Sequence, residues 1–151
     1  LARFRSMTRI LLIFLFLLIG ITTVARGEEK VITAQVANFE AQGGARILID
    51  VRTPTEWRKT GVPVGAKQFS IEGFGGTTTF VANVTKLVGG NKNVPISLIC
   101  ARGARSSKAA NVLSRAGFTN IKNVREGVLG NRKDGPGWLK RKLPTQPCMN
   151  C

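Results

Sequence analysis

The sequence predicts an α/β domain built on an open parallel β-sheet with helices on both faces. Short apolar runs rich in β-branched residues alternate along the chain with segments of helical spacing, and glycine-containing turns separate them. A chain of 151 residues suits one domain with a modest core. In such sheets ligands bind beyond the carboxyl ends of the strands, so the residues that follow each strand are the first candidates for a site.

The expected elements follow in chain order. A short helix at residues 32–40 is stopped by Gly43 and Gly44, and Thr53 with Pro54 provides the cap and first turn of a helix at 55–59. Residues 130–137 are expected to form a loop and 138–143 a terminal turn. Strands are expected at residues 46–51, 65–71, 94–99 and 121–124, and further helices at 79–88 and directly after Cys100.

Cys100 stands where one of these strands ends and a helix begins. It is followed by Ala101, Arg102, Gly103, Ala104, Arg105 and Ser106. The N–H groups of a first helical turn, the helix dipole and both guanidiniums favour a nucleophilic thiolate at this position. The same groups suit an anionic substrate or a charged persulfide. The sequence therefore predicts a reactive-cysteine site; an incidental half-buried cysteine is the alternative.

Residues 1–25 have the pattern of a signal peptide. Arg3, Arg5 and Arg9 precede an apolar run at 10–21, and small residues end at Ala25. The run is shorter than the roughly twenty residues that span a bilayer, so cleavage and export are expected, with an uncleaved membrane anchor as the alternative. We expect residues 26–144 to form the domain, in the periplasm or secreted, and residues 145–151 a separate tail.

The chain is strongly basic and contains no histidine. Lys and Arg total 23 against 8 acidic residues; without residues 1–25 the count is 20 against 8, a net charge of +12. The basic residues are scattered rather than clustered with aromatic ones, which favours small anionic partners over nucleic acid. The lack of histidine excludes Ser–His–Asp triads, Cys–His proteases and nearly all histidine-built zinc sites.

Several motifs in order resemble those of single-domain rhodaneses, sulfurtransferases of the thiosulfate-using kind. The resemblance covers residues 32–144 and is carried by residues 50–57, 61–66, 100–106 and 117–124. It implies a five-stranded parallel sheet and a persulfide-forming Cys100 cradled by residues 101–105. The four residues between Cys100 and Arg105 are one fewer than in related cysteine phosphatases, which disfavours a phosphatase. Val62 stands where the family usually has histidine, and Glu126-Gly127 where it often has two glycines.

The resemblance implies a two-step sulfur transfer without metal or organic cofactor. Cys100 takes a sulfane sulfur from thiosulfate or another anionic donor, Arg102 and Arg105 hold the sulfonate, and a thiol or cyanide accepts the sulfur. The alternative is a carrier that binds anions and delivers persulfide sulfur to a protein partner. A thiol–disulfide protein centred on the tail is a further alternative.

Other residues have more modest expected roles. Asp50 and Arg52, at the end of the first expected strand, are interpreted as a supporting ion pair or loop brace, with Glu56 as another partner of Arg52. Glu126 is a candidate for the pocket rim, and Ser106 for a bond to the loop. The expected roles at the C-terminal end are packing or a pocket-mouth position for Trp138, and a small disulfide or a redox relay for Cys148 and Cys151.

Overall fold

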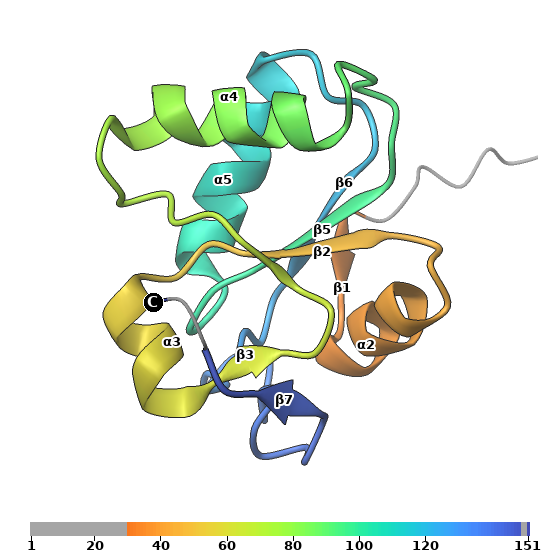
Figure 1. The fold of residues 1–151 in the computed structure, drawn as a ribbon. Helices are drawn as coiled ribbons and strands as arrows, with labels where there is room; N and C mark the ends of the chain where they lie inside the picture. Colours follow the sequence, from red (N-terminus) through yellow and green to blue (C-terminus); the bar gives the residue numbers. More distant parts are fainter. Residues whose placement is uncertain (1–29, 149–150) are drawn as a thin grey trace, which may run out of the picture.

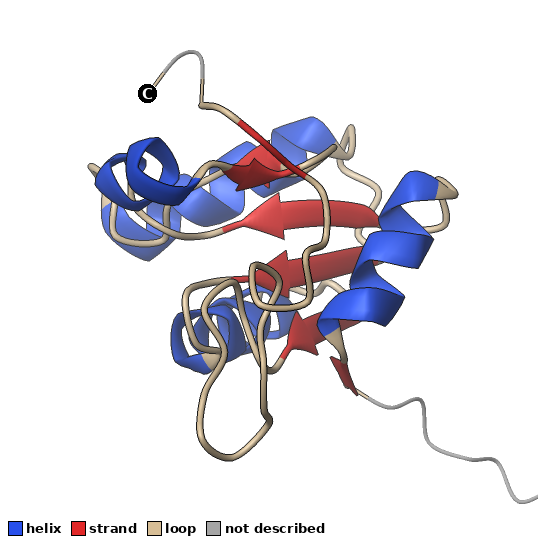
Figure 2. Ribbon diagram, turned by 90° about the horizontal axis from the view of Figure 1, so that it is seen from below, coloured by secondary structure: helices blue, strands red, loops and turns tan. Residues whose placement is uncertain are grey.

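Five parallel strands form the central sheet, in the order β1-β6-β5-β2-β4 (Figures 1 and 2). The computed structural model describes residues 30–148 and residue 151, so the predicted signal peptide lies outside the described residues. The strands are β1 Val31–Ile32, β2 Ile47–Asp50, β4 Lys67–Gln68, β5 Ile96–Ile99 and β6 Ile121–Val124. The helices are α2 Ala34–Gln42, α3 Pro54–Thr60, α4 Gly76–Leu87 and α5 Ala104–Arg115. In the described part of the chain, no helix is long and apolar enough to span a bilayer.

Helices cover both faces of this sheet, which confirms the predicted fold class (Figure 2). Along β2, alternate side chains enter two separate cores: Ile49 packs with α4 and α5, whereas Leu48 packs with α2 and α3. Cys100 belongs to the first core and Trp138 to the second. Cys100 therefore follows β5 on the α4–α5 face.

The beginning of the domain differs from the sequence prediction. Val31 and Ile32 form an edge strand that pairs with Asn123 and Val124, where a helix was expected from residue 32. The helix starts only at Ala34, because Thr33 is extended and its side chain accepts a hydrogen bond from the Val36 N–H. Consequently β2, which ends at Asp50, is the second strand along the chain and not the first.

The strand expected at 65–71 is reduced to Lys67–Gln68. The N–H groups of Phe69 and Ile71 nevertheless still donate to the carbonyls of Asp50 and Val51. Helix α4 begins three residues before its expected start. A second, antiparallel sheet that the sequence did not suggest joins β3 Val62–Pro63 to β7 Thr145–Gln146. The first residues of the expected separate tail are thus paired with the domain.

Removing residues 145–151 tests whether this segment belongs to the domain. We expect a chain that stops after Pro144 to lose about 1–3 kcal/mol of unfolding free energy in urea, because the β3–β7 pairing and the contacts of Cys148 and Cys151 with the second core disappear. A variant with Cys148→Ser and Cys151→Ser keeps β7 and should lose less. Equal stability of the shortened and full chains would show that the segment is an independent tail.

Candidate active site

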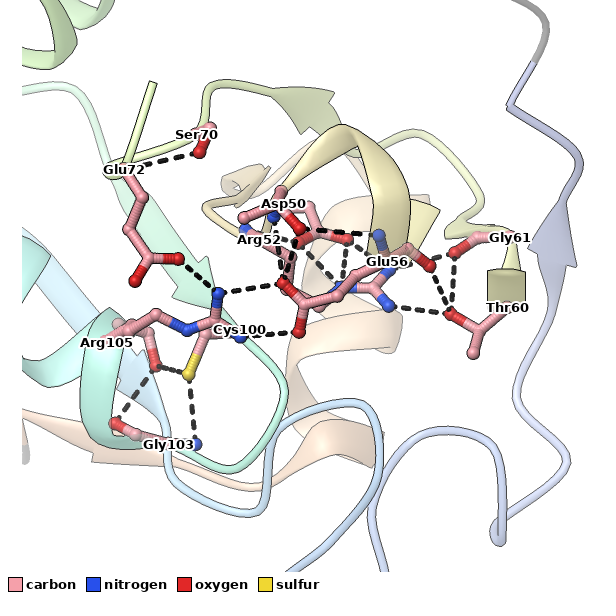
Figure 3. Close-up of polar contacts among 12 residues, drawn as sticks. Asp50, Arg52, Glu56, Thr60, Gly61, Ser70, Glu72, Cys100, Gly103 and Arg105 are labelled. Carbon is pink, nitrogen blue, oxygen red and sulfur yellow. Dashed lines mark hydrogen bonds and ion pairs between the residues drawn. The ribbon is translucent and has the colours of Figure 1, made fainter. Parts of the chain in front are cut away.

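Cys100 lies at the carboxyl end of β5, just before α5, with its sulfur turned into the loop that connects them (Figure 3). The Gly103 N–H donates to Sγ at 3.1 Å. The Ser106 hydroxyl lies 3.3 Å from the same sulfur and 3.1 Å from the Gly103 carbonyl oxygen. Cys100 is only 1% exposed and Ser106 is fully buried. The loop thus presents the Gly103 N–H to the sulfur, and the first turn of α5 presents the Ser106 hydroxyl.

A second segment holds the cysteine loop from behind. The N–H groups of Val128 and Leu129 donate at 2.9 Å to the carbonyls of Cys100 and Ala101. Gly127 has φ +67°, and a Cβ there would lie 2.6 Å from the Cys100 carbonyl oxygen. Gly103 has φ +93°, and a Cβ there would lie 2.1 Å from the Arg125 carbonyl oxygen. Both positions require glycine, because only glycine allows this conformation and this approach of two backbones.

Arg105 is held by two carboxylates (Figure 3). Its Nη2 and Nη1 donate to the two carboxylate oxygens of Glu56 at 2.6 and 2.8 Å, and Nη1 also donates to Glu72 at 2.6 Å. The expected pairing of Glu56 with Arg52 is therefore wrong. The hydrogen bond from Arg105, with further bonds from Thr53, lowers the pKa of Glu56 to about 2, although burial opposes this shift. The Glu56 hydrogen bond likewise raises the pKa of Arg105.

Asp50 and Arg52 form a buried ion pair that supports the fold. Arg52 donates to both carboxylate oxygens of Asp50, with the shortest contact 2.6 Å from Nη2, and both side chains are at most 1% exposed. Its remaining donors reach the Thr60 hydroxyl and the Gly61 carbonyl at the end of α3. The pair thus ties the carboxyl end of β2 to α3.

Arg102 points toward a different part of the molecule from Arg105. Its Nη1 donates to the Gly130 carbonyl at 2.9 Å, and its side chain is exposed. It borders two open hollows of about 390 and 610 Å³. The cationic residues that line one or both hollows are Arg102, Arg125, Arg132, Lys133 and Lys140. Ala104 begins α5 beside the larger hollow. The structure therefore gives the two loop arginines separate surroundings.

Two residues expected near a pocket are buried. Glu126 is 1% exposed and accepts a hydrogen bond from Arg141 at 3.2 Å, so it is not a rim residue. Trp138 is fully buried, and its indole N–H donates to the Pro144 carbonyl at 3.0 Å. Packing, and not a pocket-mouth position, is the role that the structure gives it.

Sequence reasoning missed Glu72 and Asn131. Glu72 reaches Arg105 from a loop 33 residues earlier in the chain. The only feature of the sequence that could have pointed to this pairing is the small number of acidic residues available to the many basic ones. The Asn131 amide donates to the carbonyls of Arg102 and Arg125, at 3.2 and 2.9 Å, and thereby joins the two loops. Nothing in the sequence around Asn131 indicated this contact.

The expected disulfide between Cys148 and Cys151 is present. Gln68 donates to the two sulfurs at 2.8 and 3.2 Å, and both cysteines pack against the second core. Cys100 belongs to the first core, on the other face of the sheet. The described contacts thus bring the disulfide to Gln68 and not to Cys100, so they give no support to a redox relay.

Comparison with a family model identifies the family of this chain. The model of the Rhodanese-like domain family matches residues 33–133. An uncharacterized protein of Rickettsia prowazekii is 27% identical over 120 residues, which cover 78% of this chain and 97% of that protein. An uncharacterized protein of Rickettsia conorii is 32% identical over 101 residues, 66% of this chain and 81% of the relative.

Solved structures show the same fold. A rhodanese-like domain from Anabaena superposes with a TM-score of 0.62 at 21% identity and covers 80% of this chain and 81% of that domain. A protein of M. tuberculosis has a TM-score of 0.58 at 28% identity, over 78% of this chain and 96% of its own. The polysulfide-sulfur transferase homodimer of Wolinella succinogenes has a TM-score of 0.54 at 23% identity, with 83% and 84% covered.

Replacing Gly127 with alanine tests the contact behind the cysteine loop. We expect Gly127→Ala to lower the unfolding free energy in urea by about 3 kcal/mol or more, since the added methyl group meets the Cys100 carbonyl in a left-handed conformation. Gly44→Ala is the matched control: Gly44 has φ +72° with no heavy atom within 4 Å of the added Cβ, so only the backbone cost of about 1 kcal/mol applies. Equal losses would contradict the close contact.

The ion pair of Glu56 predicts a pH-dependent stability. The folded-state pKa of about 2 lies below the ordinary glutamate pKa of 4.5. The pair therefore stabilises the fold at pH values above 4.5 and loses its effect as the pH falls toward 2. Because the pair is partly exposed to water, we expect Glu56→Gln to cost about 1–2 kcal/mol at pH 7. Urea unfolding of both proteins from pH 7 to 2 should show the difference shrinking; a constant difference would argue against the pair.

Proposed function

Because the chain belongs to the rhodanese-like domain family, we propose that it transfers a sulfane sulfur through a persulfide on Cys100. One observation supports Cys100 as the residue that carries the sulfur: its Sγ, at the end of β5, accepts a hydrogen bond from the Gly103 N–H and lies beside the Ser106 hydroxyl. A terminal persulfide anion requires such donors in a site from which most water is excluded.

The proposed reaction has two displacement steps. The Cys100 thiolate attacks the outer sulfur of thiosulfate; a new S–S bond forms, the bond to the sulfonate sulfur breaks, and sulfite leaves with the electron pair. The Cys100 persulfide anion then gives its outer sulfur to cyanide or a thiol. With cyanide, thiocyanate forms and the Cys100 thiolate returns. Because the enzyme is covalently modified between the two steps, ping-pong kinetics are expected.

An anionic donor is supported by the charge of the chain and of the loop. The net charge is +15 for the full chain and +12 without residues 1–25, and Arg105 lies beside Ser106 in the first turn of α5. A positive surface raises the local concentration of anions and steers them toward the site. A guanidinium is also a good ligand for a planar or tetrahedral oxyanion. Thiosulfate is the simplest sulfur donor with these properties.

A sulfur carrier for a protein partner is the second candidate. It is favoured by the occupation of Arg105 by Glu56 and Glu72 and by the 1% exposure of Cys100. Both features slow the entry of a small donor. A carrier would keep a stable persulfide on Cys100 and turn over thiosulfate slowly, until an acceptor protein removes the sulfur.

We further propose that this chemistry takes place outside the cytoplasm. The basic and apolar pattern of residues 1–25 supports export. The disulfide between Cys148 and Cys151 is consistent with an oxidising compartment. Fractionation of cells that produce the full chain tests the proposal; recovery of the protein only in the cytoplasmic fraction would overturn it.

Thiocyanate formation by the full chain tests the enzyme proposal. We expect turnover with thiosulfate and cyanide that falls at least about a thousandfold in Cys100→Ser, because a serine hydroxyl cannot form the persulfide. Cys148→Ser with Cys151→Ser is the control and should retain activity. A persulfide mass on Cys100 with negligible turnover would select the carrier. Activity that survives Cys100→Ser would contradict both candidates.

A further inference from the structure

The two carboxylates on Arg105 differ in how firmly they are held. Glu56 accepts hydrogen bonds from both Nη atoms of Arg105. It also accepts from the Thr53 N–H at 3.0 Å, in the capping box of α3, and from the Thr53 hydroxyl at 2.9 Å. Glu72 contacts Arg105 through one oxygen and one nitrogen, 2.6 Å apart. The Glu56 side chain is 29% exposed and that of Glu72 51%. Glu56 is therefore fixed, while Glu72 can leave at a smaller cost.

The segment around Glu72 also permits movement of its carboxylate. Glu72 is followed by Gly73, Phe74, Gly75 and Gly76, and Phe74 is fully exposed. A loop with two glycines before α4 and an unpacked aromatic residue has few side-chain contacts that fix it. Departure of the Glu72 carboxylate would free one Nη1 donor position, while Glu56 continues to orient the guanidinium.

We propose that Glu72 is a displaceable internal anion, which occupies on Arg105 the position that an oxyanion of the sulfur donor takes. The naming of a sulfur donor rests on the proposed function; the exchange of one anion for another at Arg105 does not. Donor binding replaces the single carboxylate contact of Glu72 by a sulfonate contact. Glu72 thereby sets the affinity for the donor and disfavours ligands that lack an oxyanion, because these cannot replace its ion pair with Arg105.

Binding of thiosulfate to the full chain carrying Cys100→Ser tests this inference without any transfer step. In calorimetric titrations at low salt, we expect Glu72→Gln to bind about tenfold more tightly, because a neutral amide competes poorly for Arg105 and no longer repels the dianion. Glu72→Asp keeps the charge but is too short to hold the same contact, so its affinity for thiosulfate should lie between that of the protein with native Glu72 and that of Glu72→Gln. Glu40→Gln is the charge control: Glu40 pairs with Arg46 before β2, at the amino end of the sheet.

A double variant shows whether Glu72 acts through Arg105. When Arg105→Gln is present, replacing Glu72 should no longer change the affinity beyond the effect of Glu40→Gln. Unchanged or weaker binding in Glu72→Gln, or no measurable binding in any of these proteins, would overturn the inference. The proposed function can fail separately. If Glu72→Gln binds more tightly but the chain with native Cys100 forms neither thiocyanate nor a persulfide, Glu72 still competes with anions for Arg105, whereas the proposed sulfur transfer is contradicted.

Discussion

The candidate site depends on the contact of two backbones behind the cysteine. The loop that leaves β5 lies so close to residues 125–129 that no Cβ fits at Gly103 or Gly127. This proximity lets the N–H groups of Val128 and Leu129 pair with the carbonyls of Cys100 and Ala101. With its carbonyls held from behind, the loop has its Gly103 N–H directed at the sulfur. Backbone geometry thus positions the N–H group that faces the sulfur, and the chain contains no histidine.

Acidic residues are scarce in this chain, and three of them lie near the carboxyl ends of β2 and β5: Asp50, Glu56 and Glu72. Asp50 holds Arg52, which in turn holds the end of α3, and Glu56 in α3 holds Arg105 in α5. These two ion pairs link β2, α3 and α5. Glu56 therefore serves two elements: it caps α3 and it orients the arginine of the cysteine loop. The buried Asp50–Arg52 pair is separate from the cationic residues that line the two hollows beside Arg102.

The sequence was sufficient for what depends on local patterns and on ordered motifs. The parallel sheet, the cap at Thr53, the position of Cys100 between a strand and a helix, and the terminal disulfide were all predicted. The sequence was not sufficient where secondary structure depends on pairing between distant segments. Val31 and Ile32 are a strand only because β6 lies beside them, and β3 exists only because β7 returns to it. Likewise the partners of Arg105 come from α3 and from the loop before α4, which are distant in sequence, so no local spacing reveals them.

The depth of the cysteine bears on how long a sulfur atom can be stored. A side chain that is 1% exposed and packed among apolar neighbours meets oxidants and stray thiols only when the surrounding loops open. A persulfide formed there is shielded during the intervals between openings. On the proposed function, storage and delivery of the sulfur would therefore both depend on the opening of the loops around Cys100.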